Sequence, residues 1–233
     1  KETLPKKLPY LKNNFFLFLP CFLFISKQKL IFSFQVHIIY LSVMKSEIRI
    51  LGLDDAPFSF GDSSTDVIGV IMRGNHYIEG VLHDIITVDG TDATSTCEHM
   101  IAKTRHVTQL KAILFDGATM GGFNIIDSEQ IWKKTKVPVI TVTRKKPDFE
   151  KIELALKKHF SDWENRINLL EKGRLQKIQT SHNPLYIKCL GISLAEAKEI
   201  ITLATIRGVV PEPLRVAHII ASGISRGESH GKA

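Results

Sequence analysis

Two stretches of sequence decide the fold: Leu51-Gly52-Leu53-Asp54-Asp55-Ala56-Pro57-Phe58 and Ala112-Ile113-Leu114-Phe115-Asp116-Gly117-Ala118-Thr119. In each stretch an apolar run ends on an aspartate, Asp54 or Asp116, and a turn follows. Such a run is typical of a strand that is buried within a sheet. A carboxylate at the end of a buried strand is costly unless something compensates its charge. Two carboxylates that converge there offer the hard oxygen ligands that magnesium prefers.

The pattern around these stretches predicts an α/β fold. Hydrophobic periodicity and turn signals indicate strands at residues 47–53, 66–73, 77–88, 111–116 and 137–142, with helices at about 92–107 and 128–134. The first three strands are joined by short turns, which favours an antiparallel meander. This order is that of a ribonuclease H-like mixed sheet, in which the meander adjoins parallel strands and helices flank the sheet. There the first strand lies beside the fourth, and Asp54 therefore lies beside Asp116.

The remaining sequence predicts three helices and a hairpin. Apolar residues recur at steps of three and four over residues 147–170, which indicates one long helix. A hairpin at 175–192, a helix at 194–206 and a last helix at 213–222 follow. Steps of three and four place one polar set on a single face of that last helix. Its members are Glu212, Arg215, His218 and Ser222.

Residues 1–43 differ in composition from the rest of the 233-residue chain. They are rich in Phe, Leu, Ile, Lys and Asn, and Glu2 is their only acid. We expect a start at Met44, with 1–43 a non-native or disordered leader and 44–233 a single domain. A membrane-associating leader is the alternative, although its apolar blocks are shorter than a spanning helix of roughly 20 residues. Segment 1–44 has a net charge of +5 out of the total of +7, so any nucleic-acid footprint must be local.

Cysteine usage and one glycine-rich loop narrow the class of protein. Cys21, Cys97 and Cys189 lie far apart and lack the spacing of metal ligands, which favours a reducing cytoplasm. The loop at 117–124 is rich in glycine but lacks the Gly-Lys-Ser/Thr ending of a nucleotide-triphosphate loop. We therefore expect no nucleotide cofactor and no membrane association of the domain.

The acidic residues near the strand ends suggest a metal centre. Asp54 and Asp116 are the expected ligands, and Asp89, at the end of the third strand, is the expected third. Asp92 is interpreted as the N-cap of the following helix. Asp55 is a turn residue that could support the ligands from behind. Each of Asp54 and Asp116 alone indicates only a turn at the end of a strand. The expected order of the strands places the two side by side and makes them candidate ligands.

Other residues are candidates for catalysis and for nucleic-acid binding. His218 and Arg215 could orient water or contact a phosphate, with Glu212 behind them; the alternative is a partly exposed polar helix face. Gly121 and Gly122 would let a nucleotide approach the backbone closely. Phe58 and Tyr77 lie near turns and could stack on a base, or could simply pack.

Four motifs taken together resemble a largely archaeal family, endonuclease dU, over residues 46–227. They are Gly52-Leu53-Asp54-Asp55-Ala56-Pro57-Phe58, Asp89-Gly90-Thr91-Asp92-Ala93-Thr94, Phe115-Asp116-Gly117 with Gly122-Phe123-Asn124, and Pro211-Glu212-Pro213-Leu214-Arg215-Val216-Ala217-His218. That family is distantly similar to endonuclease V. The resemblance implies an endonuclease that depends on Mg²⁺, or on Mn²⁺, and incises DNA near deoxyuridine, a deaminated base.

The resemblance to endonuclease V holds at some positions and fails at others. Asp54 and Asp116 match its strand-end aspartates, whereas its third-strand glutamate has no Glu here, and Asp89 takes that role by analogy. Its base-probing Pro-Tyr-Ile-Pro-Gly wedge keeps only Tyr77, Ile78 and Gly80 in this chain. Two alternatives stay open: a nuclease directed at RNA or at nucleic-acid structure with the same metal centre, and a non-catalytic nucleic-acid-binding module. The oligomeric state also stays open.

Overall fold

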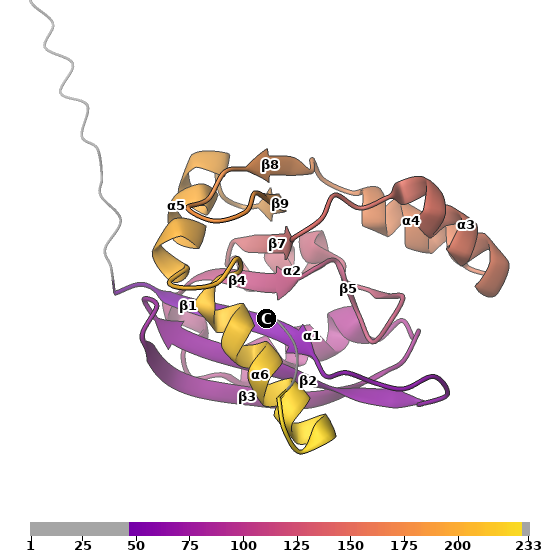
Figure 1. Cartoon of the computed structure of the whole chain (residues 1–233), viewed down its shortest axis with the longest axis horizontal. Helices are drawn as coiled ribbons and strands as arrows, with labels where there is room; N and C mark the ends of the chain where they lie inside the picture. The colour runs from indigo at the N-terminus through magenta and orange to yellow at the C-terminus, as the bar shows by residue number, and fades with distance from the viewer. Residues whose placement is uncertain (1–46, 230–233) are drawn as a thin grey trace, which may run out of the picture. The chain divides into compact units, whose positions relative to one another are not determined.

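A seven-stranded mixed sheet runs through the computed structural model, which describes residues 47–229 (Figure 1). Its order is β3-β2-β1-β4-β7-β9-β8. The predicted antiparallel meander β1–β3 and the parallel alignment of β1, β4 and β7 are both confirmed. The expectation about a leader at 1–43 concerns residues outside the described part. The strands are β1 Arg49–Asp55, β2 Ser64–Arg73, β3 Tyr77–Thr87, β4 Leu110–Asp116, β7 Val139–Thr143, β8 Gln176–Ile178 and β9 Leu185–Leu190.

The register of β1 and β4 sets the position of the two key aspartates. Leu53 pairs with Phe115 in the parallel ladder, so the next residue of each strand, Asp54 or Asp116, lies at the carboxyl end of that strand, beside its counterpart. Because side chains alternate between the two faces of a strand, Asp54 and Asp116 point to the same side of the sheet. Asp55 points to the opposite side. The buried runs before the aspartates anchor both strand ends firmly.

Two pairs of helices cover the sheet. On one face, α1 (Ala93–Lys103) and α2 (Ser128–Thr135) bury Leu51, Leu53 and their neighbours. On the other, α5 (Leu194–Ala204) and α6 (Glu212–Arg226) pack over Ile50 and the parallel strands, and α6 crosses β1 and β2 (Figure 1). Asp54 and Asp116 therefore face the α6 side. No helix within residues 47–229 combines the length and the apolar character needed to cross a membrane.

The predicted single helix over 147–170 is wrong, because the structure divides it into α3 (Phe149–His159) and α4 (Trp163–Glu171). Phe160 adopts an extended conformation, with φ −130° and ψ 127°, which ends α3. The break lets the Phe160 ring pack edge-on against Phe123 at 5.6 Å between centroids. It also lets Arg166 donate hydrogen bonds to the carbonyls of Gly90 and Phe123. Tertiary contacts thus override the helical periodicity.

The predicted helix at 92–107 is also shorter in the structure; Asp92 is its N-cap residue, as predicted, but the capping hydrogen bond comes from another side chain. It ends at Lys103, and a 3₁₀ turn, η1 (Val107–Gln109), leads into β4. The Asp92 side chain makes no capping bond; it accepts hydrogen bonds from Thr87 instead. Asn124 is the capping side chain, because its Oδ1 accepts the Ala93 N–H at 2.9 Å. Asn124 lies in a small hairpin formed by β5 (Thr119–Met120) and β6 (Asn124–Ile125).

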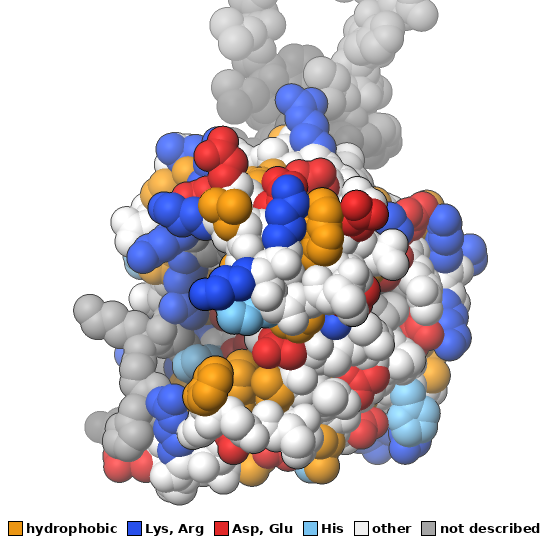
Figure 2. Space-filling model, turned by 90° about the vertical axis from the view of Figure 1, so that its right-hand side faces the viewer, with side chains coloured by type: hydrophobic (Ala, Val, Ile, Leu, Met, Phe, Trp, Pro, Cys, Tyr) orange, Lys and Arg blue, Asp and Glu red, His pale blue; other side chains and the backbone are white. Residues whose placement is uncertain are grey.

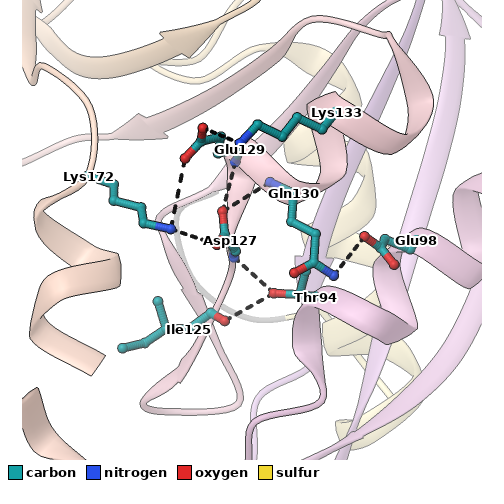
Figure 3. A network of polar contacts seen from close by, with 8 residues as sticks. All are labelled: Thr94, Glu98, Ile125, Asp127, Glu129, Gln130, Lys133 and Lys172. Atoms are coloured by element: carbon teal, nitrogen blue, oxygen red, sulfur yellow. Dashed lines mark hydrogen bonds and ion pairs between the residues drawn. The ribbon is translucent and has the colours of Figure 1, made fainter. Parts of the chain in front are cut away.

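A polar network ties α1, α2 and the end of α4 together (Figure 3). The Asp127 carboxylate accepts the N–H groups of Glu129 and Gln130 at the start of α2, and it pairs with Lys172 at 2.9 Å. Its own N–H donates to Thr94 Oγ1 of α1. Burial alone would raise the pKa of Asp127, but the Lys172 and backbone hydrogen bonds outweigh it and hold the pKa below its usual value. The network therefore fixes the helical arm α3–α4 to the body of the domain.

Candidate functional site

An open cleft of about 540 Å³ lies where β1, β4 and β7 end. Parallel strands present their carboxyl ends at one edge of a sheet, which is the usual place for a site in such folds. Figure 2 shows the side of the domain toward which β1 points in Figure 1. Basic side chains gather at the left of that view, and elsewhere acidic and basic side chains are interspersed. The cleft is lined by Asp54, Asp55, Ala56, Pro57, Phe58, Asp116, Thr143, Arg144 and His218.

Asp54 is buried and held by two hydrogen bonds. Its Oδ1 accepts the N–H of Asp55 at 3.0 Å, and its Oδ2 is 2.9 Å from Nδ1 of His218. A carboxylate has about four acceptor positions, so each oxygen keeps capacity for a further partner. Asp54 can therefore orient the imidazole and still offer an oxygen to a cation.

His218 is the residue of α6 that reaches the cleft. The hydrogen bond to Asp54 raises the pKa of His218; burial opposes this, and the negative charges of Asp54 and Asp116 add to it. With Nδ1 engaged by Asp54, Nε2 is the nitrogen left for proton transfer. This arrangement suits a group that donates a proton near neutral pH.

The other two cleft aspartates share an excess of negative charge. Burial and the charge of Asp54 raise the pKa of Asp116 to about 6, although Arg144 and His218 lower it. Burial and Asp54 raise the pKa of Asp55 to about 6 as well, against the hydrogen bond that Gly121 N–H donates to its Oδ2 at 3.0 Å. Raised carboxyl pKa values of this kind cluster at functional sites. Added positive charge would stabilise this cluster.

A family model described as endonuclease dU matches residues 46–225. The chain belongs to the endonuclease dU family. A UPF0215 protein of Methanothermobacter thermautotrophicus is 48% identical over 193 residues, which cover 82% of this chain and 94% of that protein. A UPF0215 protein of Thermococcus gammatolerans is 42% identical over 190 residues, covering 80% and 96%. The resemblance inferred from the four sequence motifs is confirmed.

Two solved structures are similar to this chain in fold. A crystal structure of a protein of unknown function from Archaeoglobus fulgidus aligns with a TM-score of 0.70 and 35% identity, covering 76% of this chain and 98% of that one. The catalytic domain of human endonuclease V aligns with a TM-score of 0.51 and 16% identity, covering 78% and 83%. At that identity the likeness concerns the fold alone. It confirms the predicted ribonuclease H-like arrangement.

The carboxylate oxygens that this endonuclease dU chain presents at the cleft are ligands of the kind that magnesium prefers. Within residues 47–229, no group of three or more His, Cys, Asp and Glu side chains already converges as a metal site. Magnesium, however, is commonly held by one or two carboxylates, with water and substrate phosphate completing its shell. Asp54 and Asp116 supply two such carboxylates at the cleft, and Asp55 is the next nearest in the charge cluster. The residues present therefore fit the ion.

We expect magnesium affinity to fall as the pH drops below about 6. The raised pKa values of Asp55 and Asp116, about 6, mean that both carboxyls bind protons below that pH and that a cation must displace them. Each displaced proton costs about tenfold in affinity per pH unit. Protonation of His218, whose pKa is raised, acts in the same direction. Calorimetric titration of the full chain from pH 5 to 8 measures this; a constant affinity would contradict it, and Asp116→Asn should flatten the curve.

Asp89, the expected third ligand, lies in the structure at the β5–β6 hairpin. It adopts the left-handed conformation, with φ 56°, after β3. Its Oδ1 accepts the N–H of Phe123 at 2.8 Å, and its N–H donates to the carbonyl of Gly121. In the described part of the chain, the residues that line the cleft do not include Asp89. The carboxylate fixes the β5–β6 hairpin, whereas Asp55 is the third carboxylate that lines the cleft with Asp54 and Asp116.

The candidate nucleic-acid residues divide into two groups. Phe58 lines the cleft, and Gly121 and Gly122 adjoin it, since Gly121 bonds Asp55 and a Cβ on Gly122 would lie 3.6 Å from the Phe58 ring. Tyr77 lies elsewhere: it pairs with Arg73, which pairs with Arg49 at the opposite end of β1. Five residues of strand, about 16 Å, separate that end from Asp54. The structure therefore does not bring Tyr77 to the cleft.

Arg215 and Glu212 pair with each other on α6. The Nε and Nη2 atoms of Arg215 donate to Oε2 of the buried Glu212 at 2.9 and 2.6 Å. In the described part of the chain, neither is among the residues that line the cleft, so the helix brings His218 there without Arg215. Both partners belong to the first turn of α6, so the pair stabilises that turn of the helix.

Arg144 is the cleft residue that the sequence reasoning missed. It follows β7, and its Nη2 lies 3.6 Å from Oδ2 of Asp116. The signal was present in the sequence, since Arg144-Lys145-Lys146 follows the fifth predicted strand, 137–142, after one intervening residue. Because that strand runs parallel to β4, its carboxyl end meets the same edge of the sheet. A guanidinium at this point suits a bound phosphate.

Proposed function

We propose that this protein is a magnesium-dependent endonuclease that hydrolyses a phosphodiester bond near deoxyuridine in DNA. One observation carries the proposal: Asp54 and Asp116 end adjacent parallel strands in an open cleft that also contains His218 and Arg144. Membership of the endonuclease dU family supports both the reaction and the deaminated base. The likeness to endonuclease V supports the fold on which the reaction would take place.

The residues of the cleft would divide the work of hydrolysis. A bound magnesium ion would polarise the phosphate, hold the attacking water and neutralise charge on the leaving oxygen. Asp54 and Asp116 would hold it. Arg144 would contact the phosphate and share its negative charge. As water adds to phosphorus and releases a proton to solvent, the bond to the leaving oxygen breaks, and His218, oriented by Asp54, would give a proton to that oxygen.

The experiment that tests this proposal is a cleavage assay of the full chain. Duplexes with one deoxyuridine, one deoxyinosine or thymine at the same position, and the matching RNA, are incubated with Mg²⁺ or with a chelator. We expect incision of the deoxyuridine strand in Mg²⁺, little of the thymine strand, and none in chelator. Faster cleavage of RNA would favour an RNA-directed nuclease. Tight binding in chelator without any product in Mg²⁺ would favour a binding module and overturn the proposal.

A further inference from the structure

The loop between β1 and β2 exposes an aromatic side chain completely. Phe60 has a relative exposure of 110%, the highest among the exposed large apolar side chains of residues 47–229, and Leu154 follows at 68%. Phenylalanine is normally among the most buried residues. A side chain so fully in water contributes nothing to the core, and its whole surface is available for contact with another molecule.

The segment that carries Phe60 is a built turn. The N–H of Asp62 donates to the carbonyl of Ser59 at 3.1 Å, and the N–H of Ser59 donates to the Asp62 carboxylate at 2.6 Å. Gly61 has φ +100°, the value that a type II turn needs at its third residue. Phe60 occupies the second residue of that turn. The sequence Ser59-Phe60-Gly61-Asp62 therefore presents the ring at the tip of a closed turn.

This turn stands beside the cleft. The chain passes from Asp54 and Asp55 through Phe58, all three of which line the cleft, and Phe60 follows two residues later, within about 7 Å of backbone. The loop after β1 projects from the carboxyl end of the strand in Figure 1. On the face shown in Figure 2, apolar side chains protrude near basic ones. Tyr77, another exposed aromatic side chain, pairs through Arg73 with the opposite end of β1.

We propose that Phe60 is a wedge that enters the base stack of bound DNA next to the bond to be cut. This inference rests on the proposed function, because the occupant is a nucleic acid whose backbone lies in the cleft. An enzyme that acts at a damaged base must loosen the duplex around it, and an apolar side chain between bases replaces the lost stacking. Phe58, on the cleft wall, would meet the base or sugar nearest the scissile phosphate.

The test measures the unstacking of bases in bound DNA while cleavage is held back. A duplex carries 2-aminopurine, whose fluorescence rises when it is unstacked, next to a deoxyuridine, and Ca²⁺ replaces Mg²⁺ to hold back cleavage. We expect the full chain to raise the fluorescence. Phe60→Ala should remove most of the rise and weaken binding about tenfold, whereas Phe60→Trp should keep both. Leu154→Ala, which removes an exposed apolar side chain from α3, is the matched control and should behave as wild type.

Each outcome decides the inference. An equal fluorescence rise and equal affinity for Phe60→Ala, at unchanged thermal stability, would overturn it and leave Phe60 to a protein partner. A full chain that binds the duplex without unstacking it would overturn it as well. The proposed nuclease activity is judged separately, because a rise that depends on Phe60 needs no cleavage. Conversely, incision in Mg²⁺ without such a rise in fluorescence would contradict the proposed role of Phe60 and support the proposed nuclease activity.

Discussion

Asp54→Asn and Asp116→Asn should each lower the rate of DNA cleavage by at least about a thousandfold, because a metal held by carboxylates supplies several kcal/mol of transition-state stabilisation. Neither change should unfold the domain. The aspartates repel one another, as the raised pKa of Asp116 reflects, so a neutral amide relieves repulsion in the cleft. In Asp54→Asn the pKa of His218 should also fall toward its usual value, because its main partner loses its charge. Single-turnover kinetics and thermal melts of the purified variants measure these effects.

Asp89→Asn tests whether the Asp89 side chain holds the β5–β6 hairpin, as its hydrogen bond indicates, or also binds the metal, as the motif predicted. Asparagine tolerates the left-handed conformation of this position, and its side-chain oxygen can still accept the Phe123 N–H. We therefore expect activity within a few-fold of wild type. If Asp89→Asn is instead as inactive as Asp116→Asn, the metal set includes Asp89, and the assignment of Asp55 beside the other two aspartates is wrong.

The pairing of Asp54 with Asp116 could be predicted from sequence for a physical reason. Each aspartate follows a buried apolar run, and the order of strands and helices permits few topologies. The β1–β4 neighbourhood follows from that order, and the pairing of Leu53 with Phe115 in the structure agrees with it. The helical spacing also singled out His218, which lines the cleft, but the same spacing grouped it with Arg215 and Glu212, which do not.

Side chains on loops and turns were less predictable than those on strands. The conformation of Asp89 depends on its hydrogen bond with Phe123, residues 34 positions apart, and no local pattern records such a contact. The motif comparison predicted Tyr77 at the site, whereas the strand register places it at the opposite end of β1. Asp92 holds the predicted N-cap position, yet the side chain that accepts the first helical N–H is that of Asn124. In all three cases a long-range contact adds to or outweighs the local signal.

Gly52→Ala should destabilise the domain by about 3 kcal/mol, the upper end of the usual cost of overpacking. Gly52 faces α6, and a Cβ there would lie 2.4 Å from the carbonyl carbon of Pro213 and 2.7 Å from the nitrogen of Leu214. These are backbone atoms at the start of a helix, so no side-chain rotation can make room. The first turn of α6 must move away from β1, and the helix that carries His218 moves with it. Activity should therefore fall along with the midpoint of urea unfolding.

Gly80→Ala provides the matched control, since Gly80 is also a strand glycine without a left-handed φ. Its nearest neighbour would be a methyl carbon of Ile71 at 3.8 Å, an ordinary contact, so the free energy of unfolding should change by less than about 1 kcal/mol. Equal stability of the two variants would mean that α6 can shift without cost. The close packing of α6 on β1 would then not fix the distance between His218 and Asp54. A large loss in Gly52→Ala alone ties the geometry of the cleft to the close approach of α6 to β1 at Gly52.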